Sequence, residues 1–158
     1  MVTRGDYTAE ATGACKAVLI ELIHLMGEFR DHVVVVGEWV PALLLPEAPE
    51  RHAGTLDIDL ALDFTQIPED SYRTILQTLS ARGYRQDPAQ PFRFFREVKA
   101  SGRESTVVEV DFLAGEYGGT GPGHRTQPIQ DSRARMARGC DLVFSEPVHV
   151  SVEGDLPG

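Results

Sequence analysis

The chain has 158 residues, of which 42% are apolar and 25% charged, and its formal net charge is −9. This length and composition are typical of one soluble globular domain whose core folds without disulfide or metal staples. The negative charge excludes a protein that coats nucleic acid nonspecifically through phosphate contacts. No apolar run approaches the roughly 20 residues that cross a bilayer, so no membrane partner is expected.

The two cysteines, Cys15 and Cys140, lie far apart and match no metal-binding spacing. We interpret them as free thiols in a reducing compartment, which favours the cytoplasm. Residues 1–13 carry acids, lack the apolar block of a secretory signal, and are polar and aperiodic. A loose terminus is therefore expected there, within a single domain that covers residues 1–158.

The first part of the chain alternates predicted helices and strands. Apolar residues recur at helical spacing over 14–30, which predicts an amphipathic helix. Four consecutive valines predict a buried strand over 32–37. A short helix is expected over 38–45, with Pro41 in its first turn, where proline is tolerated. A loop rich in proline follows over 46–54.

The middle of the chain continues this alternation. Residues 55–63 predict a second strand, and 65–84 predict a helix that Gly83 closes. Two further strands are expected over 92–98 and 105–115, with a hairpin turn between them.

The last part of the chain has weaker signals. Residues 115–128 are too rich in Gly and Pro for a regular element, 131–139 suggest a short helix, and 147–154 suggest a final strand. The order of elements predicts a small α/β (α+β) domain, with a mixed sheet flanked by helices on at least one face.

The second predicted strand, GTLDIDLALD, contains three aspartates, Asp57 and Asp59 two residues apart and Asp63 four residues later. Alternate side chains of a strand share a face, so Asp57 and Asp59 lie together at a separation of about 6.5–7 Å. Two carboxylates at this distance can converge on one cation or on a pair of cations. The parity includes Asp63, but its place at the strand end favours a capping or solvated role over a metal role.

A third carboxylate comes from the later strand, where Glu109 and Asp111 share a face by the same parity. Hard oxygen ligands without matching Cys or His suit Mg²⁺ or Mn²⁺ better than Zn²⁺. The alternative is a solvated face whose aspartates point at water. Carboxylates on two strongly apolar strands favour a cluster, and a buried cluster needs a metal or a basic partner.

These segments resemble the DNA polymerase beta-like nucleotidyltransferase superfamily. Its pattern is a strand ending in glycine, a short helix, a strand with Asp-x-Asp and a further strand with a third Asp, which read here as VVVVGEW, TLDIDL and VEVDFL. Within the superfamily, the stretch is most similar to the AbiEii/AbiGii-type nucleotidyltransferase toxins of bacteria. The resemblance covers about residues 33–115.

The resemblance implies that Asp57, Asp59 and Asp111 hold two Mg²⁺ ions, one orienting the triphosphate of an NTP and one activating an attacking hydroxyl. Asp111 is then the residue that assists deprotonation of this hydroxyl. Gly37 would let the backbone approach the phosphates, beside N–H donors at the start of the short helix. Thr55 fits a hydroxyl contact near the phosphates.

The chain departs from the family pattern in two places. Glu38 stands where a second Gly or Ser is usual, so its carboxylate repels a triphosphate unless it turns away. The family's C-terminal helical region, with a Lys and an Asp that help bind nucleotide, is not recognisable before the chain ends at VEGDLPG. Either a fragment or a domain with trimmed activity is therefore expected.

The leading hypothesis is a toxin-like, metal-dependent nucleotidyltransferase that moves an NMP from an NTP to a hydroxyl. RNA or a protein is favoured as acceptor over a small molecule, and an antitoxin is the expected partner. The alternative is a non-catalytic domain that keeps the fold and binds a nucleotide or a partner. A phosphohydrolase with the same metals, using only water as acceptor, stays open.

Other features carry weaker hypotheses. GGTGPGHRT has P-loop glycine spacing but lacks the Lys-Ser/Thr that completes the motif. His52 is a weak pocket candidate, because its loop precedes the aspartates. The stretch PFRFFREVKASGR interleaves aromatic and basic residues, which can indicate RNA contacts. We favour the reading in which Phe92 and Phe94 are core residues while Arg93 and Arg96 are exposed.

Overall fold

The computed structural model describes residues 4–45, 57–99, 104–114, 126–129, 132–136 and 140–157. The described part of the chain forms helices and strands that follow one another in this order: α1 (Arg4–Met26), η1 (Gly27–His32), β1 (Val33–Val36), α2 (Trp39–Leu44), β2 (Asp57–Leu62), α3 (Glu69–Ala81), β3 (Tyr84–Gln86), β4 (Arg93–Val98), β5 (Thr106–Ala114), β6 (Thr126–Ile129), β7 (Ser132–Met136) and η2 (Cys140–Phe144). Helices and a mixed sheet confirm the α+β class.

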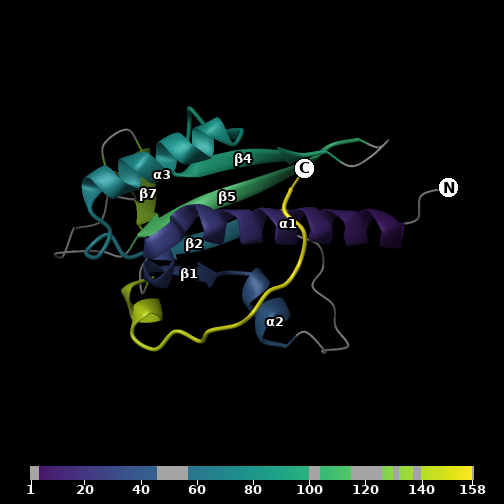
Figure 1. Cartoon of the computed structure of the whole chain (residues 1–158), viewed down its shortest axis with the longest axis horizontal. Coiled ribbons are helices and arrows are strands. Elements are labelled where there is room, and N and C mark those ends of the chain that lie inside the picture. Colours follow the sequence, from purple (N-terminus) through teal and green to yellow (C-terminus); the bar gives the residue numbers. More distant parts are fainter. Residues whose placement is uncertain are drawn as a thin grey trace.

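The strands form one sheet in the order β1-β2-β5-β4-β3 (Figure 1). Strands β2 and β5 are parallel, whereas β1 with β2, β4 with β5, and β3 with β4 are antiparallel. Strand β7 joins the end of β5, where Leu113 and Ala114 pair with Arg135 and Met136, and β6 pairs with β7. The sheet therefore centres on β5, which has neighbours on both sides.

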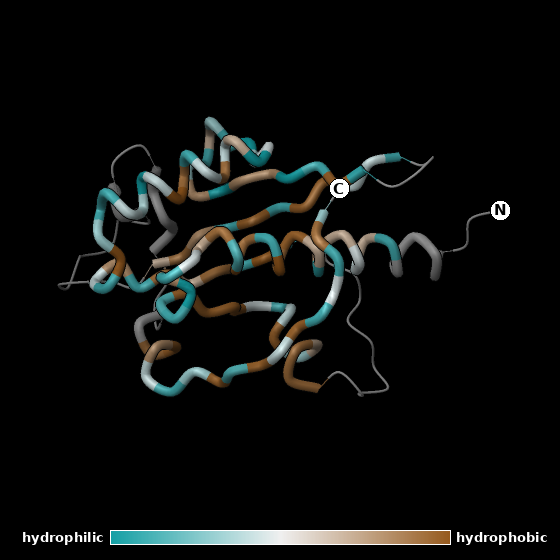
Figure 2. Tube along the Cα trace, viewed as in Figure 1, coloured by the Kyte–Doolittle hydropathy of each residue, from teal (hydrophilic) through white to brown (hydrophobic). Residues whose placement is uncertain are grey.

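One face of this sheet packs against α1 and α3. Alternate residues of β2 and β5 point toward the helices and are fully buried: Ile58, Leu60, Leu62, Val108, Val110 and Phe112. The helices contribute Val18, Leu22, Tyr72 and Leu79 to the same core. In Figure 2, the hydrophobic stretches of the central strands lie next to α1 and α3. The residues between them on each strand necessarily face the other side of the sheet.

Helix α1 is longer than its sequence pattern indicates. The prediction of a loose terminus over 1–13 is wrong for residues 4–13, which are helical. Ala11, Ala14 and Cys15 are buried against the core. Because small residues make these contacts, the apolar periodicity becomes visible only from Val18 onward. The helix also ends at Met26, and residues 27–32 continue as the 3₁₀ helix η1.

The C-terminal third corrects two predictions. Residues 132–136 form strand β7 rather than a helix, because β4 stops opposite Asp111 and leaves the end of β5 with an open edge that β7 fills. Residues 147–154 are extended but form no strand. Strands β3 and β6 and the 3₁₀ helix η2 have no counterpart in the sequence prediction.

Within the described ranges, no helix combines the length and the apolar character that a membrane span requires.

Candidate functional site

The face of the sheet opposite the helices carries four carboxylates on two neighbouring strands. In the parallel pair of β2 and β5, Asp57 lies beside Glu109 and Asp59 lies beside Asp111. Adjacent strands are about 4.8 Å apart, so each pair of acids sits at neighbouring backbone positions. The sequence placed each pair on one face of its own strand, and the register brings the two pairs together.

Burial of these carboxylates increases from one corner of the cluster to the other. Asp57 is exposed, Asp59 and Glu109 are half-buried, and Asp111 is only 6% exposed. A carboxylate as buried as Asp111 needs a hydrogen-bonded partner, because an ionised group loses its hydration inside the protein. The partner comes from the next strand of the sheet.

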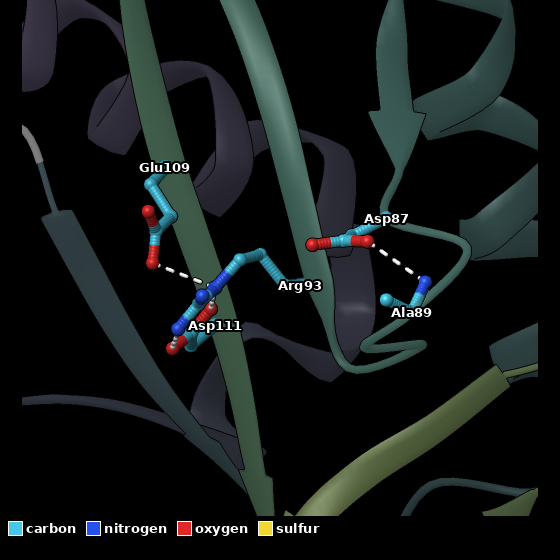
Figure 3. A network of polar contacts seen from close by, with 5 residues as sticks. All are labelled: Asp87, Ala89, Arg93, Glu109 and Asp111. Carbon is cyan, nitrogen blue, oxygen red and sulfur yellow. Dashed lines mark hydrogen bonds and ion pairs between the residues drawn. The ribbon is translucent and has the colours of Figure 1, made fainter.

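Arg93 on β4 supplies the positive charge (Figure 3). It is the register partner of Asp111 across β4 and β5. Its Nε lies 2.9 Å from Oδ1 of Asp111 and 2.6 Å from Oε1 of Glu109, and its terminal nitrogen donates to Oδ2 of Asp111 at 3.1 Å. These hydrogen bonds, first those to Asp111, raise the pKa of Arg93. The guanidinium therefore bridges the two acids of β5.

The reading of Arg93 as an exposed residue is wrong, and so is that of Arg96. Arg96 points to the helix-covered face, where its Nε lies 3.2 Å from Oε1 of the buried Glu21 on α1. Phe94, in contrast, is buried as expected. Alternation along β4 separates Arg93 from Arg96, but only the antiparallel register with β5 shows that Arg93 meets Asp111.

Glu109 responds to its crowded surroundings. Its pKa is raised, mainly by burial and then by the negative charge of Asp57, while Arg93 acts in the opposite direction. Asp111 and Asp59 add to the repulsion. One guanidinium thus faces four carboxylates, and its charge does not compensate for the desolvation and repulsion that Glu109 experiences.

Gly37 ends β1 in a conformation that glycine adopts readily, with φ of +78°. A Cβ at this position would lie 2.5 Å from Oδ2 of Asp59, which is the neighbour of Val36 across β1 and β2. The family resemblance implied a close backbone approach to phosphates here. The described structure shows a close approach to the Asp59 carboxylate, so the turn between β1 and α2 directly adjoins the acidic cluster.

The other predicted site residues are placed as follows. Glu38 precedes α2, is exposed, and makes no capping hydrogen bond with its side chain. Oδ1 of Asp63 accepts hydrogen bonds from the N–H of Thr65 at 3.1 Å and from its hydroxyl, within the turn that precedes α3. The N-cap of α3 is Pro68, so the predicted role of Asp63 as a cap of this helix is not confirmed. Thr55 and His52 lie outside the described residues.

No family model, curated protein or solved structure matches the chain. Function therefore has to be argued from the side chains on the open face of the sheet.

The carboxylates suit a divalent cation because they supply oxygen ligands, which Mg²⁺ or Mn²⁺ prefers, and because they lie on one face of the sheet. As placed, however, no three His, Cys, Asp or Glu side chains among the described residues form a group that could hold a metal ion. Arg93 engages both oxygens of Asp111. A cation held by Asp57, Asp59 and Asp111 together thus requires Arg93 to release Asp111.

Proposed function

We propose that this chain is a metal-dependent nucleotidyltransferase domain of the polymerase beta-like kind, which transfers an NMP from an NTP to a hydroxyl. The observation that supports it best is the side-by-side register of Asp59 and Asp111 on the open face of the sheet. The glycine turn after β1 lies against the Asp59 carboxylate. The proposed site needs backbone N–H groups close to acidic side chains, and this turn provides them. The order of glycine strand, short helix, Asp-x-Asp strand and third-acid strand also agrees with that fold.

In this proposal, Asp57, Asp59 and Asp111 hold Mg²⁺ or Mn²⁺, which supplies charge neutralisation at the phosphates and lowers the pKa of the attacking hydroxyl. Asp111 accepts the proton of that hydroxyl. The backbone at Gly37 and the start of α2 contact the phosphates, and exposed Glu38 turns its carboxylate to solvent. Arg93 neutralises part of the negative charge of the cluster when no cation is bound.

The acceptor and the biological setting follow from the resemblance alone. A toxin-like role favours RNA or a protein over a small molecule as acceptor, with an antitoxin as partner, in the cytoplasm. Thr55 would contact the phosphates. The identity of the labelled product tests the acceptor.

The test is transfer of label from each of four α-³²P-labelled NTPs, with Mn²⁺ or Mg²⁺, to total RNA or to a protein extract, together with pyrophosphate release. We expect Asp57→Ala and Asp59→Ala to lower both signals at least 100-fold. Glu97→Gln is the matched control, because Glu97 is an exposed acid on β4 that hydrogen-bonds Ser105 away from the cluster. Equal signals in Asp57→Ala and the unaltered chain would reject the proposal.

The second candidate is a non-catalytic domain that binds a nucleotide or a protein, and the observation that favours it is the Arg93 bridge. If the guanidinium holds Glu109 and Asp111 permanently, the third acid is not available to a metal ion. Binding of a non-hydrolysable NTP analogue without any pyrophosphate release from the NTP itself, even in Arg93→Gln, would support this candidate over the enzyme.

A further inference from the structure

Strand β1 is at one edge of the sheet, and within the described chain it pairs only with β2. The N–H of Asp63 donates to the carbonyl of His32 at 2.9 Å, which fixes the phase of the β1–β2 ladder. Because hydrogen-bonded positions alternate along an antiparallel pair, Val34 and Val36 direct their backbone groups to β2. Val33 and Val35 direct theirs outward, and the N–H of Val33 donates to the carbonyl of Arg30. The outer edge at Val35 is open to a further strand.

The C-terminal segment 147–152 runs alongside this edge. Figure 1 shows it passing β1 on the side away from β2, in the same direction as β1, before it continues past α2 and over α1. Its sequence, PVHVSV, alternates valine with other residues, which is typical of a strand with one buried face. Yet Val148 is 70% exposed and Val150 is 42% exposed. A strand pattern is thus present without strand pairing or burial.

A cavity of about 740 Å³ separates the segment from β1. One wall includes apolar side chains of α1, β1 and α2, among them Leu19, Ile23, Val35, Val40 and Leu43, together with the polar His24, Arg30 and Asp31. Residues 146–152 form the opposite wall. Side chains of Val33 and Val35 share the helix-covered face of the sheet with Leu60 and Leu62, their register partners. A strand added at this edge with its valines on the same face would fill the cavity.

Both ends of the segment lie next to other elements of the fold, and its middle spans the cavity. The segment begins after η2, which contacts β5. It then reaches α1, where a Cβ on Gly154 would lie 3.1 Å from Cδ1 of Ile20 and 3.4 Å from Cε of Lys16. Residues 147–152, between these two anchors, line the cavity.

We propose that residues 147–152 form a strap that closes on the edge of β1 as an additional parallel strand and turns Val148, Val150 and Val152 into the cavity. The open arrangement described above is then one of two states. Closure fixes Val40 and Leu43 of α2, and with them the turn at Gly37. The strap does not depend on any nucleotide chemistry, so it stands or falls separately from the proposed function.

The test is amide hydrogen exchange of the full chain, followed by NMR at Val35. In the unaltered chain we expect this amide to be protected, because closure gives it a partner on the strap. Val148→Asp should raise its exchange rate at least tenfold, since a carboxylate on the strap would lose its hydration against the apolar side chains that line much of the cavity. Leu156→Asp is the control, because Leu156 is 52% exposed in the same terminal segment but lies beyond the strap. An unprotected Val35 amide, or equal rates in the Val148→Asp and unaltered chains, would overturn the proposal.

A second measurement needs no substitution. A soluble paramagnetic probe broadens methyl signals in proportion to their exposure. Weak broadening of the Val148 methyls supports the closed strap, whereas the strong broadening of a residue that is 70% exposed contradicts it.

Discussion

Arg93 holds Asp111 through two nitrogens, from Nε to Oδ1 at 2.9 Å and from a terminal nitrogen to Oδ2 at 3.1 Å. The same Nε lies 2.6 Å from Glu109. This bridge places a positive charge beside the cluster, and it competes with any cation for the oxygens of Asp111. The balance between the bridge and a cation leads to the first prediction.

Replacing Arg93 by glutamine should destabilise the chain and strengthen cation binding. Without the guanidinium, the buried carboxylate of Asp111 is left uncompensated, which costs about 3 kcal/mol of unfolding free energy. The competitor for Asp111 is also gone, so Mn²⁺ should bind roughly tenfold more tightly, which corresponds to about 1.4 kcal/mol. Urea unfolding without divalent ions and calorimetric Mn²⁺ titration measure the two effects. The control Arg85→Gln, at an exposed position on β3, should change neither the unfolding free energy nor the Mn²⁺ affinity. An unchanged Mn²⁺ affinity in Arg93→Gln would show that no cation uses Asp111.

Replacing Glu109 by glutamine should have a more favourable effect on the stability of the chain at neutral pH than at acid pH. Burial, and then the charge of Asp57, raise the pKa of Glu109 in the folded state. The stability that this group contributes is therefore fully present below its unfolded pKa and is lost as pH rises through its folded pKa. A neutral glutamine avoids that loss. We expect the Tm of the variant minus that of the unaltered chain to increase between pH 4 and pH 7. A difference that decreases over this range would mean that Arg93 outweighs the burial and repulsion of Glu109.

Replacing Gly37 by alanine should be more destabilising than replacing Gly27. Both glycines have positive φ, +78° and +55°, so each alanine carries a left-handed backbone cost of about 1–2 kcal/mol. At Gly27 the new Cβ meets nothing within 4 Å, whereas at Gly37 it would lie 2.5 Å from Oδ2 of Asp59. The steric conflict should add about 1–3 kcal/mol. Chemical unfolding of the two variants gives the difference directly, and equal losses would show that Asp59 swings aside without cost.

Replacing Arg96 by methionine should destabilise the chain because the buried carboxylate of Glu21 loses its ion-pair partner. The Glu21 side chain is 4% exposed and the Arg96 side chain 12%, with 3.2 Å between the carboxylate and Nε. Removing one partner of such a buried pair costs about 3–5 kcal/mol. The double variant Glu21→Leu/Arg96→Met should recover most of this loss, since no unpaired charge remains. A double variant as unstable as Arg96→Met alone would mean that the arginine acts through packing, for example over the Tyr84 ring, 5.6 Å from its guanidinium carbon.

Much of the fold could be predicted from local patterns. The valine strand, the Asp-x-Asp strand, the helix after it and the two later strands are all present, because alternation and helical periodicity are properties of neighbouring residues. Side-chain parity also put Asp57 with Asp59, and Glu109 with Asp111. Prediction failed where tertiary context decides: β7 is a strand because β5 has an open edge beyond β4, and 147–154 is not a strand although its valines alternate.

The acidic residues of the candidate site could be predicted from the sequence, but the arginine that pairs with them could not. The sequence indicated that a buried acidic cluster needs a metal or a basic partner, and the structure supplies Arg93. Which arginine faces the acids depends on the register of β4 against β5, which puts Arg93 beside Asp111 and Arg96 beside Val108. A shift of one residue would exchange the faces of the two arginines, and no local pattern fixes that shift.

The parallel pairing of β2 with β5 also has a consequence for the order of folding. Asp59 and Asp111 become neighbours only after α3, β3 and β4, which lie between them in the chain, have been accommodated. Like charges thus converge through a contact that is distant in sequence, and Arg93 on β4 pairs with the strand that carries the second pair of acids. The hairpin of β4 and β5 brings Arg93 together with Glu109 and Asp111. We therefore expect repulsion among the four carboxylates to slow refolding at high pH less than it would without this arginine.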